Sequence, residues 1–279
     1  MKTASLKSVS WQAFGKSVIG PAHLRKQLPN QDALDCWVSP DSSVAILAVA
    51  DGHGDSRSFR CVTGAAFAVL TAIDVLRECL VEADSITEAG IQSLPKQLVV
   101  RWRRAVEGDL RKFPLPNNEE YEGELAASEP YLPYGTTLLA VAALPQMILA
   151  FQIGDGDILF VSDDGKVTRP LPRDPRLLAN STTSMCGDNA AADFQTKIFP
   201  CDGAVPSLIL AATDGYSNSF PSDASFFQVG SDMLALIRSE GMDAVQANLP
   251  MWLEETATYG SGDDTTLGLL WRTGPKSLR

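Results

Sequence analysis

Apolar residues follow two different patterns along this chain, and the patterns occupy separate segments. Short apolar runs bounded by polar turns predict strands, whereas apolar residues that recur every three or four positions predict amphipathic helices. The predicted strands are residues 8–14, 44–50, 136–143, 147–153, 157–161, 193–199, 207–212 and 265–271. The predicted helices are residues 58–81, a segment from residue 86 or 91 to residue 110, and residues 222–238 and 242–258. In the first helix, the apolar positions from Phe59 to Leu80 are expected to face the core.

The order of these elements predicts the fold class. Groups of strands alternate with pairs of helices, which favours antiparallel sheets covered by helices over a parallel sheet of βαβ units. We therefore expect an α/β protein of the α+β kind, a four-layer αββα sandwich with two antiparallel β-sheets flanked by helix pairs. Residues 113–134 and 169–192 are predicted to be surface loops, and residues 163–166 a hairpin turn. No repeat or linker divides the chain, so residues 1–279 are expected to form a single domain.

Composition and charge narrow the class of protein. The chain has 279 residues, 45% of them apolar, and a net charge of −11. This composition is typical of a globular protein, and the acidic balance argues against a nucleic-acid partner, which needs a basic surface. The longest apolar run, residues 138–144, is too short to span a membrane. Five cysteines, odd in number and without a C-x-x-C pair, favour a reducing compartment and no disulfide framework.

Residues 1–31 contain five basic residues and no acidic one, which allows two interpretations. An acid-poor, serine-containing start is a feature of organelle transit peptides, but arginine is scarce here and no apolar secretion segment is present. A first strand at residues 8–14 is the simpler interpretation. The protein is therefore expected to be cytoplasmic.

Aspartates stand at the ends of the predicted strands. Asp51, Asp155 and Asp214 each follow an apolar run, and Asp263 and Asp264 directly precede the last run. In an antiparallel sheet, the end of one strand lies beside the start of its neighbour. These carboxylates are therefore expected to converge at one edge of the core.

Such a cluster requires compensating positive charge. Asp32, which precedes the short apolar run 33–38, is expected to join it. Two like charges about 4 Å apart repel by about 4 kcal/mol at an effective dielectric constant of 20. Oxygen ligands select hard divalent cations, and two such ions can activate water for attack on phosphorus. A single aspartate in this position is more simply a turn residue, but the whole set favours a metal centre.

Six short motifs follow one another along the chain. They are Asn30-Gln31-Asp32-Ala33, preceded by Gly20-Pro21-Ala22-His23; Val49-Ala50-Asp51-Gly52-His53-Gly54; Gly135-Thr136-Thr137-Leu138; Ile153-Gly154-Asp155; Thr213-Asp214-Gly215; and Gly262-Asp263-Asp264-Thr265-Thr266. In this order they resemble the metal-dependent serine/threonine protein phosphatases (PPM family, type 2C), in a bacterial-type branch. The resemblance covers almost the whole chain. Any one tripeptide is weak evidence, but six in family order are strong evidence.

The resemblance implies a role for each matching metal ligand. Asp51 would bridge two ions, Mn²⁺ or Mg²⁺, and the carbonyl group of Gly52 would bind the second ion. Asp214 and Asp263 would hold the first ion. Asp32 would help to orient water on the second ion, and the metal-bound water would attack phosphorus directly, without a phosphoenzyme.

His53 matches the proposed general acid of the family, which protonates the departing serine or threonine oxygen. A pKa near neutrality suits that role. The alternative for a histidine after Asp-Gly is a simple turn residue, and the position of His53 within the signature motif favours the catalytic role. His53 and Asp51 are thus the predicted catalytic residues.

Three positions depart from the family pattern. Gln31 stands where the family usually has glutamate. Asn218 replaces an aspartate that would share a third ion with Asp155, so any third ion is expected to bind weakly. The arginine that grips the substrate phosphate is replaced by Gln27. Arg25 and Lys26 are candidate substitutes in substrate binding, although surface charges need no function.

The predicted activity is hydrolysis of phosphoserine and phosphothreonine on proteins. The expected partners are a phosphorylated protein as substrate and a cognate serine/threonine kinase, with neither nucleic acid nor membrane, and the expected state is a monomer. Two alternatives stay open. One is a phosphatase for another phosphoester, since a fold does not fix a substrate. The other is a catalytically weak or inactive relative that binds phosphoproteins or a kinase, which the three departures favour and the retained aspartates oppose.

Overall fold

The computed structural model describes residues 9–82, 86–115, 129–177, 182–203 and 205–273. Its strands form two five-stranded sheets in which all neighbouring strands are antiparallel. The first sheet has the order β1 (Ser10–Val18), β10 (Thr265–Thr273), β9 (Leu208–Ala212), β6 (Asp157–Val161) and β7 (Val167–Thr168). The second has the order β2 (Asp32–Val38), β3 (Ala45–Asp51), β4 (Leu138–Ala143), β5 (Met147–Ile153) and β8 (Gln195–Pro200).

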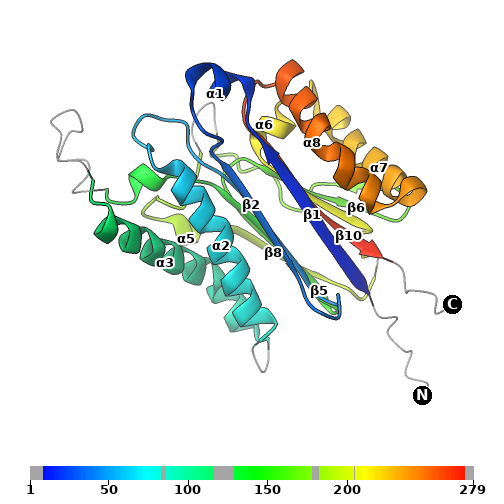
Figure 1. Cartoon of the computed structure of the whole chain (residues 1–279). Coiled ribbons are helices and arrows are strands. Elements are labelled where there is room, and N and C mark those ends of the chain that lie inside the picture. The colour runs from blue at the N-terminus through cyan, green and yellow to red at the C-terminus, as the bar shows by residue number, and fades with distance from the viewer. Residues whose placement is uncertain (1–8, 83–85, 116–128, 178–181, 204, 274–279) are drawn as a thin grey trace.

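Helices cover the outer faces of both sheets (Figure 1). The helices α2 (Cys61–Leu80) and α3 (Glu88–Lys112) share a hydrophobic cluster with β3, β4 and β5. The helices α7 (Asp223–Glu240) and α8 (Met242–Tyr259) share another with β6, β9 and β10. A third cluster lies between the two sheets. The predicted fold, two antiparallel sheets flanked by helix pairs, is confirmed.

Strand β3 illustrates how the sequence builds these layers. All of its residues from Ala45 to Ala50 are buried, and they alternate between two clusters. Ile46 and Ala48 pack toward α2 and α3, whereas Leu47 and Val49 pack against the other sheet. Successive side chains of a strand point to opposite faces, so an unbroken apolar run is what a doubly covered strand requires.

The predicted elements match the structure to within a few residues, with five additions. The sequence analysis did not predict α1 (Pro21–Lys26), the 3₁₀ turn η1 (Leu132–Tyr134), α5 (Ala190–Asp193), α6 (Asp214–Ser217) or the strand β7 (Val167–Thr168). Each is six residues or fewer, too short for a hydrophobic period to appear in the sequence. The predicted loops 113–134 and 169–192 are described only in part, because residues 116–128 and 178–181 lie outside the described residues.

The predicted core face of α2 is wrong at three positions. Val62 and Leu70 are 38% and 53% exposed, and Phe59, just before the helix, is 38% exposed. The buried residues of the helix include Gly64, Ala65, Ala68 and Ala72. These small residues let the helix lie close to its neighbours, which leaves larger apolar side chains at its margin turned outward. The prediction is confirmed for Val69, Ile73, Leu76 and Leu80.

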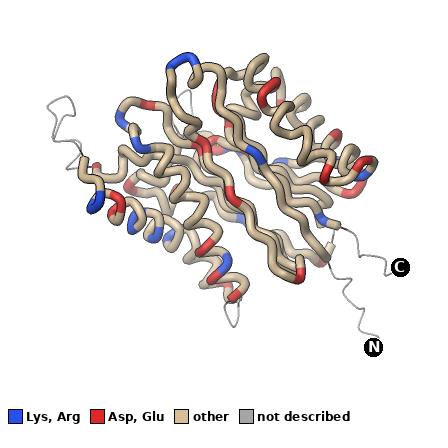
Figure 2. Tube along the Cα trace, viewed as in Figure 1, with Lys and Arg blue, Asp and Glu red and all other residues tan. Residues whose placement is uncertain are grey.

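The two helix layers differ in charge. Figure 2 shows that basic residues recur along α3, and α7 and α8 carry mostly acidic ones. All five cysteines are free. No helix within the described ranges is both long and apolar enough to cross a membrane.

Candidate active site

Two aspartates face each other where β2 begins and β3 ends. Asp32 and Asp51 are direct partners in the register of these strands, so their side chains lie on the same face of the sheet. The Asp32 carboxylate accepts hydrogen bonds from the Thr213 hydroxyl at 2.8 Å and the Thr266 hydroxyl at 2.7 Å. Both threonines belong to the other sheet or its margin. Asp32 therefore joins the two sheets at this edge.

Two further carboxylates reach the same edge from turns. Asp214 follows β9 and opens α6, and Asp155 lies in the turn between β5 and β6. Burial raises the pKa of Asp51 well above its ordinary value, and the charges of Asp32, Asp214 and Asp155 raise it further. Burial also raises the pKa of Asp214, with added repulsion from Asp155 and Asp263. The predicted convergence of these aspartates is therefore present in the folded chain.

The pKa of Asp32 is also raised, and here the value can be given. Burial raises its pKa to about 7, and the hydrogen bonds from the two threonines oppose this shift only in part. The nearby charges of Asp264 and Asp214 also raise it. Among the described residues, no lysine or arginine forms an ion pair with Asp32, Asp51 or Asp214. The negative charge of the cluster is therefore uncompensated by the chain itself.

Asp263 and Asp264 precede β10 and have different environments. Asp264 is buried and accepts hydrogen bonds from the backbone amides of Gly20 at 2.8 Å and Gln31 at 2.6 Å, and from His23 Nδ1 at 2.8 Å. The Asp263 side chain is 56% exposed, and its Oδ1 lies 3.4 Å from His23 Nε2. Asp264 thus fixes the backbone on both sides of α1, whereas the Asp263 side chain is exposed and its Oδ1 accepts a hydrogen bond from the Asp264 amide at 2.8 Å.

Gly52 and His53 leave β3 beside the carboxylates. The Gly52 amide donates to the Gln31 carbonyl at 3.1 Å, and a Cβ atom at Gly52 would lie 2.7 Å from that same oxygen. Only glycine fits such a close approach. The His53 amide donates to the Gly135 carbonyl at 3.0 Å, and His53 Nε2 lies 2.7 Å from the Ser184 hydroxyl. Burial lowers the pKa of the His53 imidazole, against a smaller opposing effect of nearby aspartates.

The structure does not bring every predicted residue into the site. Arg25 and Lys26 lie at the end of α1 with exposed side chains, and neither forms a hydrogen bond or ion pair within the part of the chain that the structure describes. Gln27 caps α1 in the left-handed conformation, with φ of 56°. A cavity of about 240 Å³ adjoins Asp155 and Asp214. It is lined by Gln152, Asp155, Gly156, Arg173, Asp174, Leu177, Asp214, Ser217 and Asn218.

Several residues of this region had no role in the sequence-based prediction. They are His23, Arg173, Ser184, Thr213 and Thr266. His23, Thr213 and Thr266 lie within the quoted motifs, so the motifs carried a signal for them. Ser184 lies in a polar loop, where nothing in the sequence distinguishes it from its neighbours.

Comparison with known proteins agrees with this geometry. A family model described as "Protein phosphatase 2C" matches residues 19–254. "Serine/threonine-protein phosphatase 3" of Escherichia coli (strain K12) is 25% identical over 276 residues, which cover 94% of this chain and 99% of that protein.

Solved structures share the fold. The Staphylococcus aureus serine/threonine phosphatase Stp1 has a TM-score of 0.63 at 12% identity, covering 98% of this chain and 100% of that chain. The catalytic domain of the phosphatase PstP, in complex with two manganese ions, has a TM-score of 0.57 at 17% identity, covering 95% and 99%. The chain therefore belongs to the protein phosphatase 2C family, and both this family and the enzyme class, protein serine/threonine phosphatase, are confirmed as predicted.

Proposed function

We propose that this phosphatase hydrolyses phosphoserine and phosphothreonine on proteins at a centre of two divalent cations, Mn²⁺ or Mg²⁺. One observation carries the proposal: Asp32, Asp51 and Asp214 are partly buried, mutually repelling carboxylates, and no lysine or arginine of the described residues pairs with them. Repulsion of this kind costs about 4 kcal/mol per close pair at an effective dielectric constant of 20. The chain would gain nothing from collecting these groups unless a cation offsets their charge.

The donor set fits hard divalent ions. Asp51, Asp32 and Asp214 offer carboxylate oxygens, which suit Mg²⁺ and Mn²⁺. The two manganese ions in the PstP complex support the same number of ions here. Asp51 would bridge both ions and the Gly52 carbonyl would bind the second, while Asp214 and Asp263 would hold the first. Bound ions offset the charge of the phosphate and make water more acidic.

Asp32 and its threonine partners have a positioning role in this proposal. Hydrogen bonds from Thr213 and Thr266 fix one carboxylate oxygen of Asp32, Oδ2. That leaves Oδ1 to orient water near the second ion. A fixed carboxylate lowers the reorganisation needed during the reaction.

His53 is the proposed proton donor. As the water oxygen bonds to phosphorus, the bond from phosphorus to the serine or threonine oxygen breaks, and His53 would give its proton to that oxygen. One proton of the water stays on the phosphate product, and the other passes to solvent, from which His53 is protonated again. The Ser184 hydroxyl at 2.7 Å holds the imidazole ring in one orientation. We add Ser184 to the proposed site as a positioning residue.

The third ion is expected to bind weakly. Asn218 Nδ2 donates a hydrogen bond of 3.0 Å to Asp214 Oδ2, so a hydrogen-bond donor stands where a carboxylate would be a ligand. Asp155 is then the principal protein ligand left for that ion. Substrate binding by Arg25 or Lys26 requires a movement of α1, because both side chains point into solvent in this structure.

The supporting residues come from both sheets, which favours one catalytic domain over residues 1–279. We propose a phosphorylated protein as substrate, a cognate kinase as its counterpart and a monomeric state. The five free thiols support a reducing compartment such as the cytoplasm.

The test is Mn²⁺-dependent hydrolysis of a phosphothreonine peptide by the purified protein, compared with the phosphotyrosine peptide of the same sequence. We expect turnover of the first peptide, none after chelation, and its recovery when Mn²⁺ is restored. Turnover of the phosphotyrosine peptide alone would favour another substrate class. Binding of the peptide without turnover at millimolar Mn²⁺ would favour the inactive relative.

A further inference from the structure

His23 is held in the site by two hydrogen bonds of the backbone and one of its own ring. The Leu24 amide donates to the Gly20 carbonyl at 3.0 Å, and the Ala22 amide donates to the Gly262 carbonyl at 2.9 Å. A Cβ atom at Gly20 would lie 2.2 Å from the backbone of Asp263. Because Gly20 has no side chain, α1 lies directly against the residues that precede β10. The His23 ring is largely buried, with 12% of the side chain exposed.

The contacts of Asp264 decide which ring nitrogen of His23 carries hydrogen. Asp264 accepts the Gly20 amide on one oxygen and the Gln31 amide on the other. An ionised carboxylate only accepts hydrogen bonds, so His23 Nδ1, 2.8 Å from Asp264 Oδ2, is the donor. His23 Nε2 is then directed at Asp263 Oδ1, 3.4 Å away. A buried carboxylate that holds Nδ1–H and turns Nε2 toward a ligand is the usual support of a metal-binding histidine.

The separation of these two atoms suits a shared ion. Metal–nitrogen and metal–oxygen bonds of about 2.1 Å at right angles place adjacent ligand atoms about 3 Å apart. The observed 3.4 Å between His23 Nε2 and Asp263 Oδ1 is close to this value. One oxygen or nitrogen atom from each of His23, Asp263 and Asp264 lies within 4.8 Å of the others. Since both Asp264 oxygens are already bonded, Asp264 orients the histidine. Asp263 Oδ1 accepts one hydrogen bond, from the Asp264 amide at 2.8 Å, and a carboxylate oxygen has a second lone pair that can bind an ion.

We propose that His23 Nε2 is a nitrogen ligand of the cation that Asp263 holds. This inference rests on the proposed first metal site and changes its chemistry from all-oxygen to mixed nitrogen and oxygen. Imidazole binds transition-metal ions well, whereas Mg²⁺ prefers oxygen ligands. The site should therefore favour Mn²⁺ or a later transition-metal ion over Mg²⁺.

The test is pulsed electron paramagnetic resonance of the Mn²⁺-loaded protein, which detects nitrogen bound to manganese. The chain has only two histidines, so the source of a signal can be assigned. We expect a directly bound ¹⁴N signal in the unmodified protein that becomes a ¹⁵N signal when histidine is ¹⁵N-labelled. The signal should persist in His53→Asn and be lost in His23→Asn. The asparagine amide in His23→Asn can still donate to Asp264, so the fold of this loop is preserved.

A binding measurement gives a second readout without turnover. In His23→Asn the Mn²⁺ affinity of the first site should fall about 10–100-fold, as for other losses at metal sites, with a smaller change for Mg²⁺. Mn²⁺ bound by the unmodified protein without a histidine nitrogen signal would overturn this inference and leave the proposed function intact. No Mn²⁺ binding by the unmodified protein would overturn both. Absence of the signal in the labelled, unmodified chain would overturn the inference without any variant. Since labelling marks both histidines, the signal is assigned to His23 by its persistence in labelled His53→Asn, so the assignment does not depend on the folding of His23→Asn.

Discussion

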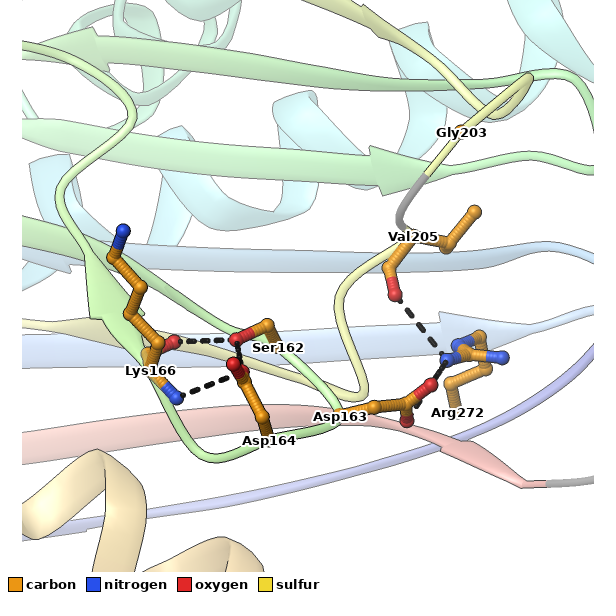
Figure 3. Close-up of a pocket in the computed structure, with 7 residues that line it drawn as sticks. All are labelled: Ser162, Asp163, Asp164, Lys166, Gly203, Val205 and Arg272. Carbon is orange, nitrogen blue, oxygen red and sulfur yellow. Dashed lines mark hydrogen bonds and ion pairs between the residues drawn. The ribbon is translucent and has the colours of Figure 1, made fainter.

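Carboxylates at the two ends of the β-sandwich have opposite environments. At the end where β6 finishes, Asp163 accepts hydrogen bonds from Ser207 and from Arg238 and Arg272 (Figure 3 shows Asp163 and Arg272). The Ser207 hydroxyl and these arginines lower the pKa of Asp163. At the end where β6 begins, burial and neighbouring aspartates raise the pKa of Asp51 and Asp214.

This difference between the carboxylates shows where the chain places a basic side chain beside a carboxylate and where it does not. Asp157 lies at the same end as the proposed metal site and is almost fully buried, yet Arg169 Nε lies 2.5 Å from its carboxylate. The fold can therefore deliver arginine to that end. The lack of a basic partner at Asp32, Asp51 and Asp214, among the residues described, is a selective feature of the site. Proteins often keep such uncompensated groups where they are needed for function.

The largest expected effect comes from removing the charge that would bridge both ions. Asp51→Asn should lower phosphatase activity by about 10³-fold, the size of loss typical for a group that stabilises the transition state. The same variant should raise the unfolding temperature of the metal-free protein, because it removes a buried, repelled charge. Enzyme assays and thermal denaturation in chelator measure the two effects. A variant that loses activity and metal-free stability together would contradict the uncompensated cluster.

At the same end, Asp157 has a basic partner, Arg169, and removing that partner should lower the unfolding temperature. Arg169→Met leaves Asp157 buried without its partner, and such breaks cost about 3–5 kcal/mol. The unfolding temperature should therefore fall by roughly 6–20 °C in a chain of this size. Adding Asp157→Asn to this variant should recover part of the loss, since the unpaired charge is then gone. Equal stability of the single and double variants would show that Arg169 acts through packing alone.

The stability of the metal-free protein should depend on pH at the end of the sandwich where the aspartates gather. The raised pKa of Asp32, about 7, means that the folded metal-free protein binds this proton more tightly than the unfolded chain. Its stabilising effect is complete below the ordinary carboxyl range and disappears as pH rises through about 7. The unfolding temperature in chelator should therefore fall between pH 5 and pH 8.

Mn²⁺ should reverse that fall. At a free concentration of about 100 times the dissociation constant, a bound ion stabilises by about 2.7 kcal/mol. This corresponds to an increase of roughly 5–10 °C in unfolding temperature. The increase should grow from pH 6 to pH 8, because protons compete with the ion at the lower pH. An increase that is independent of pH would argue against binding at these carboxylates.

The smallest effect is expected at the other end of the sandwich. Asp163→Asn removes a largely exposed carboxylate, and exposed ion pairs contribute about 0–1 kcal/mol. Because the Asp163 pKa is lowered, any stabilisation is present at neutral pH and lost as pH falls below the ordinary carboxyl range. Activity and the response to Mn²⁺ should stay unchanged, which makes this variant the matched control for Asp51→Asn. A large loss of activity would contradict the functional separation of the two ends.

Much of the fold could be predicted from the sequence because the buried segments are long and their apolar residues follow a clear pattern. The strands β5 and β6 were predicted with their observed bounds, since unbroken apolar runs between polar turns leave few alternatives. Helix α1 was missed because none of its six residues is buried, so it has no apolar face to reveal it. Val62 and Leu70 were wrongly predicted to be buried. A helical period shows that a helix has an apolar face, but it does not show which part of that face packs closest to its neighbours.

The residues of the candidate site could be predicted where a carboxylate directly follows a predicted strand. Asp51 and Asp214 fall there, and the family motifs supplied their proposed roles. The supporting contacts depend on how the two sheets are placed against each other. Thr213 and Thr266 reach Asp32 across that boundary, and Ser184 reaches His53 from a loop 131 residues away. Hydroxyl groups are common in this chain, and only the folded arrangement selects these few.

The contacts of Asp264 also bear on when the enzyme can first work during its synthesis. This side chain holds the Gly20 and Gln31 amides and His23, which precede it by 244, 233 and 241 residues. A nascent chain that has not yet released β10 from the ribosome lacks these anchors, along with Asp263. Such contacts of very long sequence separation form late. Phosphate release should therefore begin only when translation of this region is nearly complete, and stalled shorter chains should be inert toward phosphoproteins.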